Sequence, residues 1–293
     1  MRWRFAVALS AIFAALCGWY WHSGHADGVE RVSVSPLIGP ADDADFGGFS
    51  GYETNGTTRH LLTDRGHLYT LSGEEISAVT LQGIDGAPLG RRWRDAEGLV
   101  ALGNGRFAVS FEGRHRVDIY DGTTGMIVEK LPLADEFERL GGNSGLEALA
   151  LSPSGELVAI AERSGASERP FPVFVFDVAE WRKTSISRRG AFLPVGADFG
   201  PGGRLYVLER DYLLSGFRSR IRMFEWRDGV PHEDETLLKT RFWTHANLEG
   251  IAVFEEAGET YIELISDNNF LPVLASELVR YRKKALEIRG LGG

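Results

Sequence analysis

The sequence has almost no cysteine, and this excludes one common way of stabilising an exported domain. Among its 293 residues, only Cys17 is a cysteine, so a disulfide framework cannot hold the fold together. Glycine, in contrast, is abundant, with 36 residues, which predicts frequent turns. A chain of this length can form one large all-β domain.

Positive charge is also scarce. The chain has 32 Lys and Arg against 41 Asp and Glu, which gives a formal net charge of −9. We therefore expect neither nucleic acid nor an anionic membrane surface as the main partner, because both repel an acidic protein. The charge is compatible with cations, including a metal that bridges the protein to an anionic substrate.

Familiar catalytic motifs are missing from the sequence. It has no G-x-S-x-G elbow, no H-E-x-x-H zinc motif and no Walker A or Rossmann glycine motif. The missing elbow weighs against ester hydrolysis by a Ser-His-Asp triad. A cysteine nucleophile is excluded if Cys17 is removed with a leader peptide.

One long apolar run lies at the N-terminus. The positively charged Met1–Arg4 precedes residues 5–21, which are apolar apart from Ser10. Gly24 and Ala26 supply the small residues of a cleavage site, so we expect residues 1–26 to be a signal peptide. The alternative is an uncleaved anchor through residues 5–21, since about 17 residues is the lower limit for spanning a bilayer.

The short apolar region and the Gly-x-Ala site favour cleavage. Cleavage would leave a protein without cysteine, which needs no oxidative folding. We expect it in a bacterial periplasm or outside the cell, and without membrane contact once the signal is removed.

A repeat occupies the rest of the chain. Each unit has an acidic residue close to a glycine, a short apolar strand, a turn, and a second strand that ends on another acid. The leading acids follow one another at about 50 residues, which is a spacing typical of propeller blades. They are Glu53, Glu97, Glu147, Asp198 and Glu249.

The spacing predicts an all-β fold, a β-propeller of five four-stranded blades, or six if residues 64–97 contain another blade. The last unit lacks an obvious fourth strand, and the alternating residues 30–38 can supply it. Pairing the two ends would close the ring and remove an open sheet edge. With no linker in the sequence, residues 27–293 form one domain.

The repeat predicts a cluster of acids at one mouth of the central channel. The first strand of a blade lines the channel and the second runs antiparallel beside it, so the start of one and the end of the other lie on the same face. The expected pairs are Glu53/Asp64, Glu97/Glu112, Glu147/Glu162, Asp198/Glu209 and Glu249/Asp267.

So many carboxylates raise one another's pKa values and need compensating cations. Nearby arginines or a bound metal can compensate them, and hard oxygen ligands suit Ca²⁺ better than zinc. Asparagines beside the acids add neutral oxygen ligands. The competing interpretation is structural, in which each acid only helps to hold neighbouring blades together.

Several segments of the repeat form a recognisable set of motifs. They are Phe46-Gly-Gly-Phe-Ser-Gly51, Leu62-Thr-Asp-Arg-Gly66, Asp95-Ala-Glu-Gly98, Asn143-Ser-Gly-Leu-Glu-Ala-Leu-Ala150, Leu208-Glu-Arg210, Asn247-Leu-Glu-Gly-Ile-Ala252 and Ser266-Asp-Asn-Asn-Phe270. Together they resemble the family named for the esterase-like activity of phytase. The resemblance runs in order over residues 46–270. It implies an exported β-propeller that hydrolyses a phosphoric or carboxylic ester.

We therefore predict a calcium-assisted hydrolase that acts as a monomer on a small-molecule ester. The expected catalytic residues are Glu249, Asp267 and Glu147. Substrate-binding residues are expected to be Arg210, Arg163, Asn143, Asn247 and Asn268. Metal ligands are expected to be Glu53, Asp64, Glu97, Glu162 and Glu209. The alternatives are a calcium-dependent lactonase and a non-catalytic propeller that binds a sugar, a metal or a protein.

Overall fold

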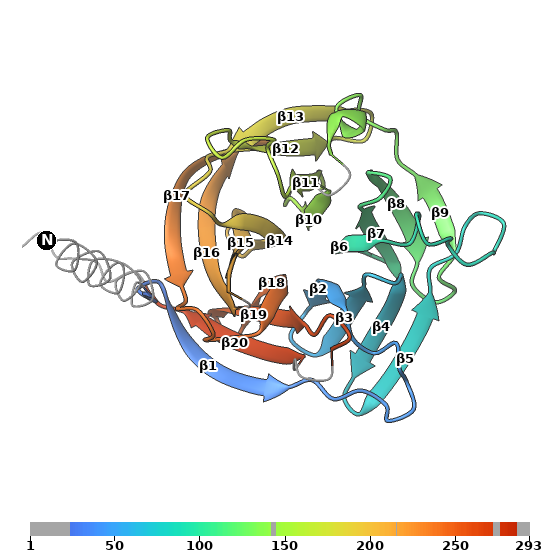
Figure 1. Ribbon diagram of the computed structural model, residues 1–293, viewed down its shortest axis with the longest axis horizontal. Helices are drawn as coiled ribbons and strands as arrows, with labels where there is room; N and C mark the ends of the chain where they lie inside the picture. The colour runs from blue at the N-terminus through green and yellow to red at the C-terminus, as the bar shows by residue number, and fades with distance from the viewer. Residues whose placement is uncertain (1–23, 142–144, 215, 272–275, 286–293) are drawn as a thin grey trace, which may run out of the picture.

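The computed structural model describes residues 24–141, 145–214, 216–271 and 276–285. The strands form five four-stranded antiparallel sheets arranged as blades around a central channel (Figure 1). The predicted β-propeller fold is confirmed, with five blades. Residues 64–97 contain no sixth blade, because they supply the outer strands of blade one and the segment leading into blade two.

Each blade begins with its innermost strand. Blade one has β2 (Phe49–Thr54), β3 (Thr58–Thr63), β4 (His67–Ser72) and β5 (Glu75–Thr80). Blade two has β6 (Ala96–Gly103), β7 (Arg106–Phe111), β8 (Arg116–Asp121) and β9 (Ile127–Lys130). Blade three has β10 (Leu146–Leu151), β11 (Leu157–Ala161), β12 (Phe171–Phe176) and β13 (Trp181–Ile186). A 3₁₀ turn, η1 (Phe137–Arg139), lies between blades two and three.

The last two blades have the longest strands. Blade four has β14 (Leu193–Gly200), β15 (Arg204–Leu213), β16 (Gly216–Arg227) and β17 (Val230–Lys239). Blade five has β18 (Asn247–Glu256), β19 (Glu259–Asp267), β20 (Glu277–Lys283) and, from the other end of the chain, β1 (Val29–Pro36).

The ring closes as the sequence predicts. β1 pairs antiparallel with β20, from Val29 opposite Lys283 to Pro36 opposite Glu277. β1 is the outermost strand of its sheet, where a proline removes no ladder hydrogen bond that another strand needs. The N-terminal strand therefore completes blade five.

The hydrophobic core lies between neighbouring blades. Strands such as β12 are apolar at almost every position, because blade three is covered on both faces. Near the channel the inner strands approach so closely that some positions accept only glycine. A Cβ on Gly98 would lie 2.6 Å from Leu149 in blade three, and one on Gly250 would lie 2.5 Å from Tyr52 in blade one. The glycine after the acid is thus a packing requirement of the ring.

The region expected to be a signal peptide, residues 1–26, falls mostly outside the described residues. Among those that the structure describes, no helix is long and apolar enough to cross a membrane.

Candidate functional site

Each inner strand has a bulge near its start, and the bulge decides which residue faces the mouth. The pairing with the second strand shifts at Glu97, Glu147 and Glu249. The same shift falls on Ser50 in blade one and on Val195 in blade four. Three blades, not five, therefore place a leading acid at the mouth.

The predicted equivalence of Glu53 and Asp198 with those three acids is wrong. Glu53 lies three residues beyond Ser50 (53 − 50), and Asp198 three beyond Val195 (198 − 195). Both carboxylates accept backbone hydrogen bonds from the next blade, Glu53 from Ala101 at 3.3 Å and Asp198 from Val253 at 2.5 Å. Burial raises the pKa of Asp198 to about 7, while burial and the charge of Asp198 raise that of Glu53. They form a second carboxyl pair, deeper in the channel.

At the mouth end of the second strand, the residue that pairs with the position two before the bulge is acidic in four blades and basic in one. Asp64, Glu112 and Glu162 each donate a backbone N–H to the residue that precedes the inner strand, and Asp267 pairs with Asn247. In blade four this position belongs to Arg210, which pairs with Leu193.

Glu209 comes one residue earlier and does not reach the mouth. Its side chain is fully buried inside blade four, where it forms ion pairs with Arg220 at 2.5 Å and Arg222 at 3.1 Å. Arg222 is fully buried as well and also contacts Asp234. The structure thus gives Glu209 a place in an ion-pair network of the blade interior and not among ligands at the channel.

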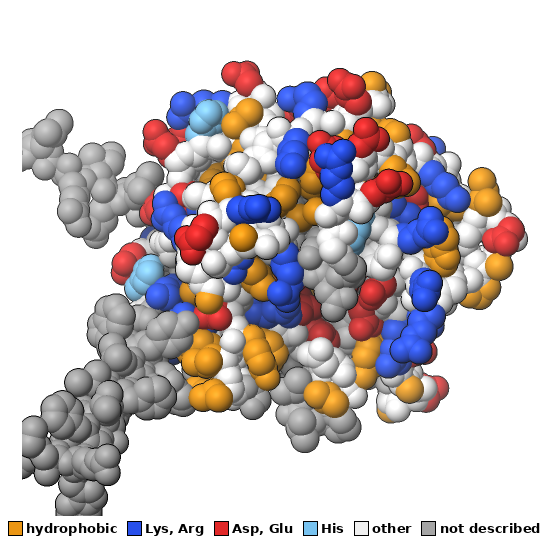
Figure 2. All heavy atoms as spheres, turned by 45° about the horizontal axis from the view of Figure 1, so that its top comes forward, with side chains coloured by type: hydrophobic (Ala, Val, Ile, Leu, Met, Phe, Trp, Pro, Cys, Tyr) orange, Lys and Arg blue, Asp and Glu red, His pale blue; other side chains and the backbone are white. Residues whose placement is uncertain are grey.

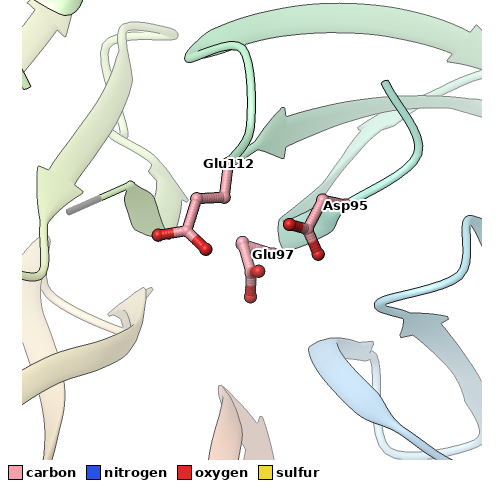
Figure 3. A group of neighbouring side chains, drawn as sticks. All are labelled: Asp95, Glu97 and Glu112. Carbon is pink, nitrogen blue, oxygen red and sulfur yellow. The ribbon is translucent and has the colours of Figure 1, made fainter. Parts of the chain in front are cut away.

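Blade two brings three carboxylates together. Oxygens of Asp95, Glu97 and Glu112 all lie within 4.8 Å of one another, and Figure 3 shows these side chains directed into a common space. Burial, then the charges of Glu147 and Glu249 and of its two partners, raises the pKa of Glu97 well above its usual range. No described residue forms an ion pair with any of the three, so this acidic triad can hold a metal ion.

Arg210 occupies the opposite side of the mouth. It forms an ion pair with Glu249, contacts Glu162 at 3.6 Å and donates to Oδ1 of Asn247 at 2.9 Å. Asn247 in turn donates to Glu249 at 2.8 Å. The charge of Arg210 therefore compensates acids from blades three and five. Figure 2 shows acidic side chains near the middle of one face with Lys and Arg side chains around them.

Two aspartates between these groups have pKa values near neutrality. Burial raises the pKa of Asp267 to about 7, helped by the charges of Glu249 and Asp64. Burial also raises the pKa of Asp64 to about 6, with the charges of Asp95 and Glu249 adding to it against the opposing effect of Arg65. Oδ1 of Asp64 is buried and has no hydrogen-bond partner among the described residues. Such carboxyls can accept a proton near neutral pH.

The remaining residues that the sequence predicts for catalysis or substrate binding do not all lie at the mouth. Glu147 lies at the mouth, where burial and the charges of Glu162, Glu112 and Glu249 raise its pKa. Arg163 is half exposed and pairs with Glu162 at 2.9 Å. Oδ1 of Asn268 accepts the N–H groups of Gly48 and Phe270, each at 3.0 Å, which ties blade five to blade one. Asn143 lies outside the described residues.

Two members of the triad were not predicted as metal ligands. Glu112 was expected at the mouth as the partner of Glu97 but not among the ligands, and Asp95 was quoted only as part of a motif. The signal for Asp95 was available, because it stands two residues before Glu97 on the segment that leads into an inner strand. Asp95 and Glu97 flank Ala96, the first residue of β6, and side chains that flank the start of a strand can face the same space.

Comparison with known proteins supports one family. The phytase-like family described as "esterase-like activity of phytase" matches residues 44–270. The chain therefore belongs to this family. None of the curated proteins matches the sequence significantly.

Solved propeller structures resemble the chain only distantly. The PQQ-bound aldose sugar dehydrogenase from Streptomyces coelicolor is 11% identical, with 89% of this chain and 100% of that chain covered and a TM-score of 0.48. Regucalcin from Agrobacterium tumefaciens, described as a calcium-binding protein, is 8% identical, with 81% and 91% covered and a TM-score of 0.47. Streptogramin B lyase is 11% identical, with 90% and 99% covered and a TM-score of 0.43. Likenesses of this degree carry no argument about function.

Proposed function

We propose that this protein hydrolyses a small phosphoric or carboxylic ester at the acidic mouth of its channel, with the help of Ca²⁺. The observation that carries the proposal is the triad of Asp95, Glu97 and Glu112, whose oxygens lie within 4.8 Å of one another without a paired cation. Membership of the phytase-like family supports the reaction class.

The residues present fit a calcium ion. The triad offers carboxylate oxygens from a short stretch of blade two, and carboxylates are the ligands that Ca²⁺ prefers. When bound, such an ion would offset two of the triad's negative charges and polarise an oxygen of the ester. We assign the ion to Asp95, Glu97 and Glu112, so Glu53 and Glu209 have no part in holding it.

The other mouth residues suit the remaining steps. Asp267, with its pKa of about 7, can take the proton of the attacking water, because a general base works best when its pKa is near the operating pH. Glu249 is less suited to that role, since Arg210 and Asn247 already engage its carboxylate. Arg210 can stabilise negative charge that develops on the ester oxygen. Water adds across the ester bond, which yields the acid and the alcohol.

The first test is direct. The mature protein is purified, its metal content is measured, and it is assayed with aryl phosphates, aryl acetates and lactones with and without Ca²⁺. We expect Ca²⁺ to raise the Tm and to support hydrolysis of an ester. Turnover of lactones alone would show that the substrate is a cyclic ester and not an open-chain one. Ca²⁺ binding without any turnover would identify a non-catalytic binding propeller and overturn the proposal.

Matched variants assign the roles. Glu97→Gln is expected to abolish the Ca²⁺-dependent rise in Tm, whereas Asp267→Asn should retain it and lose about 100-fold or more in kcat, as expected for a general base. Glu53→Gln is the control, because it removes a buried channel acid that lies away from the triad. Equal effects of all three variants would contradict the assignment.

We also propose that the protein works outside the cytoplasm as a monomer, after removal of residues 1–26. N-terminal sequencing of the exported protein and its mass in solution test this. A retained N-terminus would favour an anchor through residues 5–21.

A further inference from the structure

Four arginines, which we call the arginine cluster, lie beside the acidic triad on the mouth face of blade two. They are Arg91, Arg92, Arg94 and Arg114. Three of them precede Asp95 on the segment that leads into β6, and the fourth follows Glu112 in the turn between β7 and β8. Both segments lie at the mouth, because β6 begins there and β7 ends there.

Two contacts show how close the cluster is to the triad. A Cβ on Gly113 would lie 2.8 Å from the carbonyl oxygen of Arg92 and 4.0 Å from the Cβ of Asp95. Burial raises the pKa of Asp95, and the positive charge of Arg94 opposes that rise. The arginine cluster therefore adjoins the triad, with Arg94 next to it in the chain.

Trp93 fixes the position of the cluster. Its N–H donates to the carbonyl oxygen of Gly90 at 2.7 Å, which closes a turn with two of the arginines at its corner. Its own carbonyl oxygen accepts from Arg116 at 2.6 Å, and the guanidinium of Arg114 covers its ring at 4.8 Å. An arginine that lies over an aromatic ring can still present N–H groups at its edge to an oxyanion.

The four guanidinium groups have no ion pair and no side-chain hydrogen bond with any residue that the structure describes. Three of the side chains are exposed and that of Arg94 is partly exposed. Arg65, Arg163 and Arg210, which belong to other blades, each form an ion pair with a carboxylate. A chain with a net charge of −9 thus concentrates positive charge without ion-pair partners at one place, and such a patch attracts anions.

We propose that the arginine cluster binds a second oxyanion group of the substrate, a phosphate or a carboxylate that is not itself attacked. The inference rests on the proposed ester hydrolysis, in which Arg210 on the opposite side of the mouth serves the reacting group. Guanidinium groups bind both kinds of oxyanion through paired N–H donors and keep their charge at every physiological pH. An oxyanion held by the cluster places the rest of the substrate beside the triad. The preferred substrate is therefore an ester that carries negative charge away from the bond that breaks.

Calorimetric titration of the Ca²⁺-loaded protein tests the proposal with phenylphosphonate, benzoate and benzyl alcohol. We expect one or both anions to bind about tenfold more tightly than the neutral alcohol, because hydrogen bonds to charged groups stabilise more than neutral ones. Tighter binding of phenylphosphonate would identify a phosphate as the bound group, and tighter binding of benzoate a carboxylate. The double variant Arg92→Gln/Arg114→Gln should lose most of the preference for anions, although its Arg210 and its metal ligands are intact.

Arg106→Gln is the matched control. Arg106 is also exposed and has no ion pair among the described residues, but it begins β7 on the face opposite the mouth, so this variant should bind the anions as the wild type does. Thermal unfolding of each variant shows that it is folded. Equal binding of the anions and the alcohol, or a preference that the double variant retains, would overturn the proposal.

Turnover assays of the same proteins separate this inference from the proposed function. An anion preference that depends on the arginines, in a protein that hydrolyses no ester, would keep the oxyanion site and reject the hydrolase. Ester turnover without the anion preference would do the reverse.

Discussion

Blade two and blade four use the same backbone positions for opposite purposes. At the bulge of the inner strand, blade two has Glu97 and blade four has Val195. Opposite the residue two before the bulge, blade two has Glu112 and blade four has Arg210. Blade four supplies the guanidinium that compensates acids of its neighbours. Blade two has only acids there, and none is ion-paired to a described residue.

The difference shows how one ring can hold both structural and functional charges. Where the protein supplies the opposite charge itself, the carboxylates are fixed by ion pairs and hydrogen bonds. Where it does not, repulsion raises the free energy of the folded state, and a bound cation would lower it. The asymmetry between the two blades is therefore the strongest reason to place a metal at blade two.

The largest effect is expected from the interior of blade four. Glu209→Gln removes the charged partner of the buried Arg220 and one of the two charged partners of Arg222, and we expect a loss of about 3–5 kcal/mol in the free energy of unfolding. Urea unfolding measures this loss. The Ca²⁺-dependent rise in Tm should persist, because Glu209 does not face the channel. Loss of the Ca²⁺ effect in a folded Glu209→Gln protein would contradict this separation.

A somewhat smaller loss is expected from Arg210→Gln. Without its guanidinium, Glu162 and Glu249 repel each other, and we expect about 3 kcal/mol less stability at pH 8 by comparison with similar broken pairs. The loss should shrink at pH 5, because burial raises the pKa of Glu249 and a protonated Glu249 no longer repels Glu162. Urea unfolding at both pH values tests this, and equal losses at the two would show that Arg210 acts through packing alone.

The wild-type protein should itself lose stability as the pH rises. The folded-state pKa values of Asp267 and Asp64, about 7 and about 6, are raised above the usual 3.8. Between these limits the folded state holds protons that the unfolded state has released, so the free energy of unfolding falls from about pH 4 to about pH 7. Thermal unfolding without metal measures this trend. A stability that rises with pH in the absence of metal would contradict the assignment.

The smallest effect is expected deep in the channel. Glu53→Gln keeps an oxygen for the N–H of Ala101 but removes repulsion with Asp198. We expect a gain of about 1 kcal/mol or less at pH 8 and no change in Ca²⁺ binding. Urea unfolding and a calcium titration check both statements. A weaker Ca²⁺ affinity of the Glu53→Gln protein would show that the pair of Glu53 and Asp198 contributes to calcium binding at the mouth.

The sequence predicted the fold better than the site. Spacing of the units and the alternating residues 30–38 were enough for five blades and a closed ring, because strand length and turn positions are local signals. The site depended on a bulge in each inner strand, which no local signal revealed. As a result, Glu53 and Asp198 were assigned to a position that Ser50 and Val195 occupy.

A one-residue difference explains the other discrepancy. Successive side chains of a strand point to opposite faces, so Glu209 and Arg210 have different environments although they are neighbours. The repeat suggested that an acid at this position faces the channel in every blade. In blade four the acid faces the blade interior, and only the network with Arg220 and Arg222 shows which residue fills the channel position.

The closure of blade five has a consequence for the order of folding. Glu30 and Arg282 form a salt bridge across 252 residues of sequence. β1, the first strand to be synthesised, therefore cannot pair until β20, the last one, has been synthesised. Blades one to four can each form from a continuous segment, whereas the fifth must wait for the whole chain. We expect closure of the ring to be the last and slowest step of folding, because joining distant segments costs the most chain entropy.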